Sequence, residues 1–374
     1  MLHAAKWYWP SVGGIETAAN DITGAVQGKA DVDILVCSET GRENGITKDG
    51  VTIKRVPTLC NLCSTPLSFE YITAFRKMSK HADLIQIHAP FPLSDLALFL
   101  CKRKHTAKVA VWWHSDVVKQ KKLLFFYRPL MKSMLKRADV IFVAGDAIAK
   151  KSAYLGPYAD KVKVIPFGID KNRYTLVADT GYLTDRLNDK SSIKLLFVGR
   201  LVYYKGVEVL LRAMQATSGC ELFIIGTGEL ESSLVELSKQ LKLEDKVHFL
   251  GRVGEDELHS AFYDSDVFVL PSVSRSECFG LVQLEAMIFG KPVINTSLPT
   301  AVPEVSLNGE TGITVTPGDV KELSEAINLL ATNHELRESY GRAARLRCES
   351  HFSLEKMQSD LYKEYIKLLF PGDA

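Results

Sequence analysis

The chain has 374 residues, of which 46% are hydrophobic and 24% charged, so it has the composition of an ordinary globular protein long enough to bury two cores of usual domain size. No apolar run approaches the roughly 18 residues that cross a bilayer, and the start has neither a basic leader nor a small-residue cleavage site, so we expect a cytoplasmic protein. The formal net charge of +2 conceals a basic first half, because residues 1–173 carry 26 Lys and Arg against 15 Asp and Glu.

The first half predicts β-strands that alternate with helical stretches. The expected strands occupy residues 2–7, 31–38, 51–57, 83–90, 108–115, 139–145 and 161–170. The second half repeats the pattern more clearly, and its expected strands occupy residues 194–201, 220–228, 246–253, 266–272, 291–296 and 312–318. Their nearly continuous apolar character is typical of parallel sheets covered by helices on both faces.

We therefore predict an α/β chain with two Rossmann-like, doubly wound domains that face each other across a cleft. The expected domains are residues 1–173 and 174–354, and a polar segment without periodicity that begins at residue 174 is interpreted as the linker. In such sheets ligands bind beyond the carboxyl ends of the strands, so the residues that follow each strand are the first candidates for a site.

Glycines and cations follow several of these strands. Gly13 and Gly14 follow the first strand and Gly226 follows a later one, where glycine lets backbone N–H groups approach a phosphate, although simple turn chemistry explains each glycine equally well. Arg200 ends the strand KLLFVGR, and Lys205 lies in the loop that follows. Two fixed cations there can bind a diphosphate, the alternative being a solvated pair of loop residues.

The stretch SECFGLVQLEAMIFG, residues 276–290, contains a carboxylate where an apolar side chain is expected. Glu285 lies four residues after Leu281, beside an apolar helical stripe, and therefore needs a partner. Phe279, Gly280 and Leu281 would begin that helix, and Glu277 lies in the loop before it. Because a carboxylate accepts two hydrogen bonds from a vicinal diol, a ribose is one partner that satisfies Glu285.

The combination of these motifs resembles a known family. The spacing Glu277-x7-Glu285, the GGIE segment, the pattern FVGRLxxxKG and His114 after an early strand are together similar to retaining GT-B-fold glycosyltransferases of the large family numbered four, over nearly the whole chain. The resemblance implies a nucleotide-sugar donor held mainly by the second domain and an acceptor held mainly by the first. It also implies a last helix, within residues 355–374, that crosses back onto the first domain.

The same resemblance implies a role for each candidate residue. Arg200 and Lys205 would grip the donor diphosphate, and Glu285 would bind the ribose. Glu277 would contact the transferred sugar and the diphosphate, and His114 would touch the donor sugar. Phe279, Gly280 and Leu281 fall, with Glu277, where the family contacts the transferred sugar and the diphosphate. Gly13 and Gly14 match the loop that closes over the phosphates, and Gly226 stays a candidate phosphate contact from its turn alone. One departure is that Thr300 and Ala301 stand where many relatives carry two glycines.

The resemblance implies retention by front-face attack, in which the leaving phosphate takes the acceptor proton and the protein supplies orientation and electrostatics. We expect no metal or other cofactor. Asp31-Val-Asp33 and Asp264-Ser-Asp266 mimic a metal-binding D-x-D, but both adjoin strands, where capping explains them. Asp116 is interpreted as either a second cleft residue or the N-cap of the next helix. The C-x-x-C pair of Cys60 and Cys63 is interpreted as reduced thiols rather than a zinc site.

Residues 119–137 alternate cations with large apolar residues. Such a helix can lie on an anionic lipid surface, or it can be a partly buried helix with a solvated basic face. The basic first half favours peripheral contact with the inner face of the cytoplasmic membrane, and no nucleic-acid-binding module is recognisable. The segment HSDVVKQK is similar to a subgroup of mannosyl- and rhamnosyltransferases of bacterial O-antigen and capsule-type polysaccharides, which makes GDP-mannose the first candidate donor and a saccharide or lipid-linked saccharide the acceptor.

Two other interpretations are compatible with this pattern. A glycoside phosphorylase or a nucleotide-sugar epimerase would use the same fold, and a sugar-nucleotide-binding protein without catalysis would need fewer of these residues. The joint presence of His114, Arg200, Lys205, Glu277 and Glu285 favours an enzyme.

Overall fold

The computed structural model describes residues 1–8, 13–38, 41, 43–46, 50–62, 65–101, 107–117, 121–174 and 180–372. The chain divides into two compact units. Unit 1 comprises Met1–Phe167 and Leu354–Ala374, and unit 2 comprises Gly168–Ser353. The division therefore falls after Phe167 rather than after residue 173.

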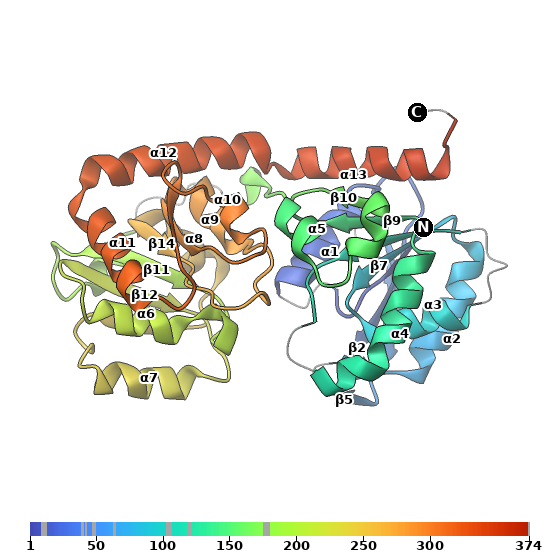
Figure 1. The fold of residues 1–374 in the computed structure, drawn as a ribbon, viewed down its shortest axis with the longest axis horizontal. Helices are drawn as coiled ribbons and strands as arrows, with labels where there is room; N and C mark the ends of the chain where they lie inside the picture. The colour runs from blue at the N-terminus through green and yellow to red at the C-terminus, as the bar shows by residue number, and fades with distance from the viewer. Residues whose placement is uncertain are drawn as a thin grey trace. The chain divides into compact units, whose positions relative to one another are not determined.

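Unit 1 is built on an eight-stranded sheet in the order β10-β9-β8-β7-β1-β2-β4-β3, in which every neighbouring pair is parallel except β3 with β4 (Figure 1). Its strands are β1 (Leu2–Ala4), β2 (Asp33–Ser38), β3 (Glu43–Ile46), β4 (Thr52–Pro57), β7 (Leu84–Ala89), β8 (Lys108–Trp113), β9 (Val140–Val143) and β10 (Val162–Val164). β7 is buried along its whole length, as expected for a strand covered on both faces. A separate hairpin pairs β5 (Cys60–Leu62) with β6 (Thr65–Leu67).

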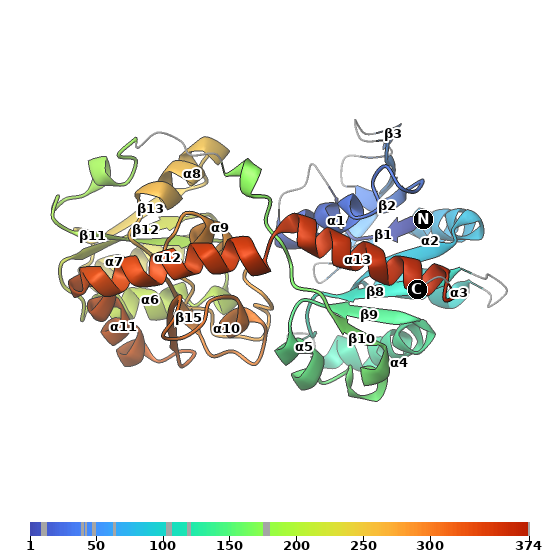
Figure 2. The ribbon, with the colours of Figure 1, turned by 90° about the horizontal axis from the view of Figure 1, so that it is seen from above.

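The helices of unit 1 include one from the end of the chain. They are α1 (Gly14–Gly24), α2 (Phe69–Met78), α3 (Pro92–Leu100), α4 (Lys121–Arg137), α5 (Asp146–Lys151) and α13 (Leu354–Leu369). α13 lies next to α1 and crosses the sheet (Figure 2). The Tyr365 hydroxyl of α13 donates to Gln86 Oε1 at 2.8 Å, and its ring packs edge-on against Phe142. The last helix is thus part of the core of unit 1.

Unit 2 contains a six-stranded parallel sheet in the order β13-β12-β11-β14-β15-β16. Its strands are β11 (Ile193–Val198), β12 (Cys220–Ile225), β13 (Val247–Gly251), β14 (Val267–Val269), β15 (Val293–Thr296) and β16 (Gly312–Val315). Each overlaps its predicted segment, and all except β15 end before the predicted carboxyl end. Its helices are α6 (Val207–Met214), α7 (Glu231–Gln240), α8 (Glu255–Asp264), α9 (Val282–Ile288), α10 (Val302–Val305), α11 (Val320–Thr332) and α12 (His334–His351).

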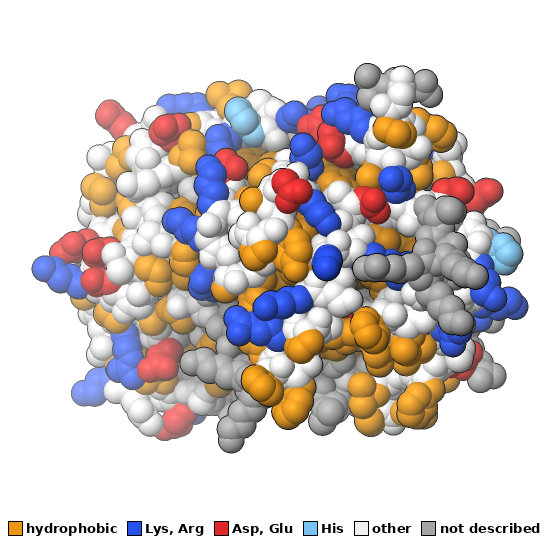
Figure 3. Space-filling model, turned by 45° about the vertical axis from the view of Figure 1, so that its right-hand side comes forward, with side chains coloured by type: hydrophobic (Ala, Val, Ile, Leu, Met, Phe, Trp, Pro, Cys, Tyr) orange, Lys and Arg blue, Asp and Glu red, His pale blue; other side chains and the backbone are white. Residues whose placement is uncertain are grey.

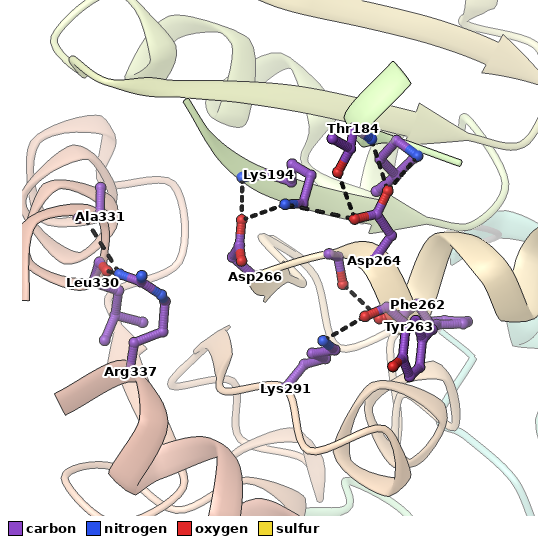
Figure 4. A network of polar contacts seen from close by, with 12 residues as sticks. Thr184, Lys194, Phe262, Tyr263, Asp264, Asp266, Lys291, Leu330, Ala331 and Arg337 are labelled. Atoms are coloured by element: carbon purple, nitrogen blue, oxygen red, sulfur yellow. Dashed lines mark hydrogen bonds and ion pairs between the residues drawn. The ribbon is translucent and has the colours of Figure 1, made fainter. Parts of the chain in front are cut away.

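The polar segment interpreted as a linker belongs to unit 2 where the structure describes it. Asp264 at the end of α8 accepts hydrogen bonds from the backbone N–H groups of Leu183 and Thr184, both at 2.7 Å (Figure 4). Glu221 of β12 accepts two more, from the N–H groups of Asn188 and Asp189. Polar side chains of the domain bind the backbone of this segment, and its Leu183 and Leu187 are buried. Its otherwise polar composition made it resemble a linker.

Candidate active site

Two loops of unit 2 meet at the carboxyl ends of β11 and β14. Gly206 follows the short 3-10 turn Tyr203–Lys205 with φ at +70°, and a Cβ at this position would lie 2.0 Å from the carbonyl oxygen of Pro271. The N–H of Val273 donates to the carbonyl of Tyr204 at 2.8 Å. Glycine is therefore required for a contact between backbones, and that contact brings Lys205 beside the loop that carries Glu277.

Lys205 and Glu277 form a buried ion pair. Lys205 Nζ lies 2.7 Å from Glu277 Oε2, and about a tenth of each side chain is exposed. The Ser272 hydroxyl, in the loop after β14, donates to the same carboxylate oxygen at 3.1 Å. Such a pair is held in one geometry because either charge alone would be costly to bury. The sequence predicted both residues for the site but did not predict that they bind each other.

Arg200 extends the cationic side of this loop. Its side chain is exposed, and its Nη2 donates to the Tyr204 hydroxyl at 3.1 Å. The Tyr204 ring centroid is 5.8 Å from Lys205 Nζ, within the range of a cation–π contact. Tyr204 therefore contacts both cations, and sequence reasoning did not select it.

Glu285 lies on α9 with its carboxyl partly buried. Burial raises the pKa of Glu285 to about 7, although a hydrogen bond with Tyr174 and the nearby Lys205 ammonium act in the opposite direction. The partner that the sequence required is thus Tyr174, in the segment interpreted as a linker. A carboxyl group that is only partly ionised near neutral pH, beside a cation, is common at binding sites.

Buried polar side chains hold the backbone of the segment before α9, which contains Phe279 and Gly280, in place. Gln283 Nε2 donates to the carbonyl of Phe279 at 3.0 Å, and Asn295 Nδ2 donates to Gln283 Oε1 at 2.9 Å. Gly280 has φ at +72°, and a Cβ there would lie 2.7 Å from Leu270. Phe279 is buried, with its ring edge against Phe352. Its side chain is therefore a packing residue, so that contact with a ligand would fall to its backbone.

Other glycines selected from the sequence have different surroundings. Gly226 has φ at +129°, and a Cβ there would lie 2.1 Å from the carbonyl oxygen of Gly199, so packing of the loops after β11 and β12 already requires glycine. Leu281, at the start of α9, is partly exposed. In unit 1, Gly14 begins α1 and Gly13 precedes it, while the preceding residues 9–12 lie outside the described part of the chain.

His114 lies in unit 1 directly after β8. Its side chain is buried, and its Nε2 lies 3.0 Å from Nδ1 of His88 on β7, with the two rings stacked. The ring of Phe167 stacks on His114 as well. Burial lowers the pKa of His114 well below its ordinary value, so the imidazole is neutral at physiological pH. Sequence reasoning missed His88, because a histidine within an apolar strand is typical of a core residue.

Asp116 forms structural hydrogen bonds through both carboxylate oxygens. Its Oδ1 accepts from Trp113 Nε1 at 3.0 Å and from the Ser152 hydroxyl at 2.6 Å, and its Oδ2 accepts from the N–H of Ala153. The carboxylate thus ties the segment after β8 to the end of α5. Both interpretations of Asp116, as a second cleft residue or as an N-cap, stay predictions, since residues 118–120 before α4 lie outside the described part of the chain.

The second D-x-D sequence has a structural role. Asp264 binds the backbone near Thr184, and Asp266 Oδ2 accepts from the N–H of Lys194 at 2.7 Å, with the Lys194 ammonium between the two carboxylates (Figure 4). The expectation of backbone capping is confirmed for this pair. Within the described ranges, no group of three or more His, Cys, Asp or Glu side chains is arranged to hold a metal ion. Cys60 is a free, exposed thiol, and Cys63 lies outside the described residues.

The amphipathic segment forms α4, which carries exposed aromatic side chains. Phe125 is 75% exposed and Phe126 78% exposed. Lys119 and the side chains of Lys121 and Lys122 fall outside the described residues. Hydrophobic side chains also reach the surface in groups beside Lys and Arg side chains on the face drawn in Figure 3. None of the described helices is long and apolar enough to cross a membrane.

Comparison with known proteins shows the family. Residues 184–347 match the family of glycosyl transferases group 1, and residues 13–168 match the glycosyl transferase 4-like domain. The chain is 33% identical over 360 residues to D-rhamnosyltransferase WbpZ of Pseudomonas aeruginosa, with 94% of this chain and 92% of that protein covered. This chain belongs to the glycosyl transferases group 1 family. The resemblance stated from the motifs is thereby confirmed.

Further similarities of this group 1 glycosyltransferase extend over its full length. It is 30% identical over 371 residues to O-antigen chain mannosyltransferase C of Escherichia coli, with 99% of this chain and 98% of that protein covered. Its fold is similar to that of sucrose-phosphate synthase from Thermosynechococcus elongatus, with a TM-score of 0.82, 21% identity and 99% of both chains covered. The α/β GT-B fold class is confirmed, and the chain is a retaining glycosyltransferase.

Proposed function

We propose that this enzyme transfers a hexose from a nucleotide-sugar donor to a saccharide or lipid-linked saccharide acceptor during synthesis of a bacterial O-antigen or capsule-type polysaccharide. The observation that carries the proposal is the Lys205–Glu277 ion pair beside the partly ionised Glu285, at the strand ends of unit 2. Similarity over the full length to a rhamnosyltransferase and a mannosyltransferase supports a hexose as the transferred sugar. It also makes GDP-mannose the first candidate donor.

In this proposal the donor diphosphate binds Arg200 and Lys205. A phosphate oxygen that approaches Lys205 shares its ammonium with Glu277, whose carboxylate then accepts hydrogen bonds from hydroxyl groups of the transferred sugar. Glu285 accepts two hydrogen bonds from the ribose diol, and ligand hydroxyls thereby replace part of the water that its burial removed. The backbone of Gly13, Gly14, Gly226, Phe279, Gly280 and Leu281 would complete the donor contacts, and His114 would contact the sugar.

The reaction proposed is a front-face displacement. The acceptor oxygen bonds to the anomeric carbon on the face that the nucleotide leaves, the bond from that carbon to the phosphate oxygen breaks, and the acceptor proton passes to the departing phosphate. The neutral, buried imidazole of His114 is a poor proton acceptor, which supports a route in which the phosphate takes the proton. Arg200 and Lys205 stabilise the charge that develops on the phosphate, and no metal is required for that step.

The membrane surface is a further proposed partner. Exposed Phe125 and Phe126 near the start of α4, a helix with Lys136 and Arg137 in its last turn, support contact with an anionic lipid layer at the inner face of the cytoplasmic membrane. Such contact would bring a lipid-linked acceptor to the enzyme.

A donor panel tests the proposed function. Thermal unfolding is measured with GDP-mannose, UDP-glucose and ADP-glucose, because a ligand that binds the folded state raises the melting temperature in proportion to its affinity. We expect a rise with GDP-mannose that exceeds the other two, followed by release of GDP that depends on an added acceptor saccharide. Release without an acceptor, dependence on inorganic phosphate, or no rise with any nucleotide sugar would contradict a transferase of this specificity.

A further inference from the structure

Two histidines of unit 1 share a single buried hydrogen bond. His88 on β7 and His114 after β8 are 3% and 8% exposed, and His88 Nδ1 lies 3.0 Å from His114 Nε2. Their rings stack with centroids 5.3 Å apart. A third buried histidine, His3 of β1, lies on the other side of His88 with ring centroids 5.9 Å apart.

Both members of this pair are neutral. Burial lowers the pKa of His88 to about 3, and burial together with His88 lowers the pKa of His114 well below its ordinary value. A neutral imidazole carries one N–H and one lone pair. One ring must therefore donate and the other accept, and the direction of the bond decides which nitrogen of His114 carries its proton.

The surroundings of Nε2, the second ring nitrogen of His88, decide which histidine donates the hydrogen bond. Nε2 of His88 is buried and has no hydrogen-bond partner among the residues that the structure describes. If His114 donated, the proton of His88 would sit on Nε2 as a buried N–H without an acceptor, which is the rarer and more costly arrangement. If His88 donates through Nδ1, its Nε2 presents only an unused lone pair. The second arrangement is favoured.

We infer that His88 is a positioning residue, which donates from Nδ1 to Nε2 of His114 and thereby keeps the proton of His114 on Nδ1. His114 then offers a ligand a hydrogen-bond donor, and its only lone pair is already engaged. This inference rests on the proposed function for its consequence: His114 donates to an oxygen of the donor sugar or phosphate and does not accept the acceptor proton.

The tautomer is measured on the full chain without any ligand. Long-range ¹H–¹⁵N spectra of protein labelled with ¹⁵N-histidine separate protonated from unprotonated ring nitrogens, and His114→Asn identifies the signals of His114. We expect a proton on Nδ1 in the wild type and loss of that preference in His88→Phe. A wild-type His114 protonated on Nε2 would overturn the inference.

Two amide variants of His88 distinguish a role in orienting His114 from a role in filling the core. Asparagine carries its amide nitrogen on Cγ, as histidine carries Nδ1, whereas glutamine places the same amide one carbon farther out. We expect His88→Asn to restore the Nδ1 proton of His114 and His88→Gln not to restore it. This comparison remains decisive if His88→Phe fails to fold, and equal behaviour of the Asn and Gln variants would overturn the inference.

The same variants are then assayed with a donor. We expect His88→Phe and His88→Gln to lower kcat by about tenfold or more with little change in KM, since an imidazole in the wrong tautomer is present but misdirected, and His88→Asn to recover most of the rate. His3→Asn is the matched control, because it removes a buried imidazole of the same cluster that makes no described bond to His114. If no donor supports transfer, the proposed function fails, while the spectra still decide the tautomer.

Discussion

At the scale of single residues, the site depends on charges that the fold holds close together. Lys205 and Glu277 are separated by many residues in the sequence, and they meet only because Gly206 lets its loop contact the carbonyl of Pro271. The proposed mechanism assigns this pair and Arg200 the electrostatic work of the reaction, and Glu285 the binding of the nucleoside.

Removal of either cation should lower turnover strongly. We expect Arg200→Ala or Lys205→Ala to reduce kcat by about a hundredfold or more, the scale of one lost preorganised charge contact. Steady-state rates with a saturating acceptor measure this. Because Lys205→Ala leaves Glu277 buried without its partner, the double variant Lys205→Met/Glu277→Gln is the folding control, and it should be stable yet inactive. Arg212→Ala, which removes an exposed cation of the same unit, should keep the full rate. Unchanged rates in the site variants would remove these residues from the reaction.

Glu285 should destabilise the folded protein at high pH, although it contributes to nucleotide binding. Its folded-state pKa of about 7 lies above the ordinary value of 4.5, so the folded state binds more protons between these pH values, and the stability of the protein falls as pH rises through that window. We expect Glu285→Gln to raise the free energy of unfolding by about 1–3 kcal/mol at pH 8 and to change it little at pH 4.5, as measured by urea unfolding.

The same substitution should weaken nucleotide binding. An ionised Glu285 accepts both ribose hydrogen bonds, so wild-type affinity for GDP should fall between pH 8 and pH 6, and this dependence should be absent in Glu285→Gln. Glu208→Gln on α6 is the matched control, since among the described residues its carboxylate pairs only with Arg212, at the surface. A stability of Glu285→Gln that follows the wild type at every pH would refute the assignment.

Several of these residues were predictable and several were not. Arg200 and Lys205 stand at or after the end of a predicted strand and Glu285 stands at helical spacing, so local pattern made them candidates. The resemblance to a known family was needed to assign a role to all four, Glu277 included. Tyr174 was not, because it lies in a stretch without periodicity and becomes the partner of Glu285 only through folding. His88 shares the apolar pattern of β7, and its role depends on a neighbouring strand that the sequence does not place beside it.

At the scale of elements, the six parallel strands of unit 2 were predictable because each is a continuous apolar run. Most of their carboxyl ends were not, because apolar residues continue past the last paired residue, as Leu201 does after β11 and Leu270 does after β14. In unit 1, β3 at the edge of the sheet and the separate β5–β6 pair were missed, since short antiparallel strands carry little apolar pattern.

The helix α4 should bind anionic membranes through its first turns. We expect the triple variant with Glu at Lys119, Lys121 and Lys122 to lose binding to vesicles of phosphatidylcholine and phosphatidylglycerol by about a hundredfold or more, because each basic residue near such a surface contributes about 1 kcal/mol. Phe125→Ser/Phe126→Ser should weaken binding to the same vesicles by removal of the exposed aromatic rings. Co-sedimentation measures both.

The control for this experiment is Lys321→Glu on α11, whose side chain is exposed and paired only at the surface with Glu325. It should bind vesicles as the wild type does, and vesicles of phosphatidylcholine alone should bind none of the proteins strongly. Equal vesicle binding by the wild type and the triple variant would contradict membrane binding by α4.

At the scale of the whole molecule, the two units should respond differently to a nucleotide. The cations and Glu285 belong to unit 2, so GDP without a sugar should slow amide hydrogen exchange chiefly in the loops after β11 and β14 and at the start of α9. Hydrogen exchange followed by mass spectrometry, with and without GDP, measures this. The same experiment on Lys205→Met/Glu277→Gln is the control and should show little protection. Protection confined to unit 1 would contradict the assignment of the donor to unit 2.

The position of α13 in unit 1 has a consequence for how the protein is made. The strands of unit 1 leave the ribosome early, but Tyr365, which binds Gln86 and packs on Phe142, is synthesised only after all of unit 2. Until then the first unit has an uncovered apolar surface where this helix will lie, and chains cut short by premature termination retain that surface. Such fragments should depend on chaperones and be degraded rapidly, even though every proposed donor-binding side chain is already present in them.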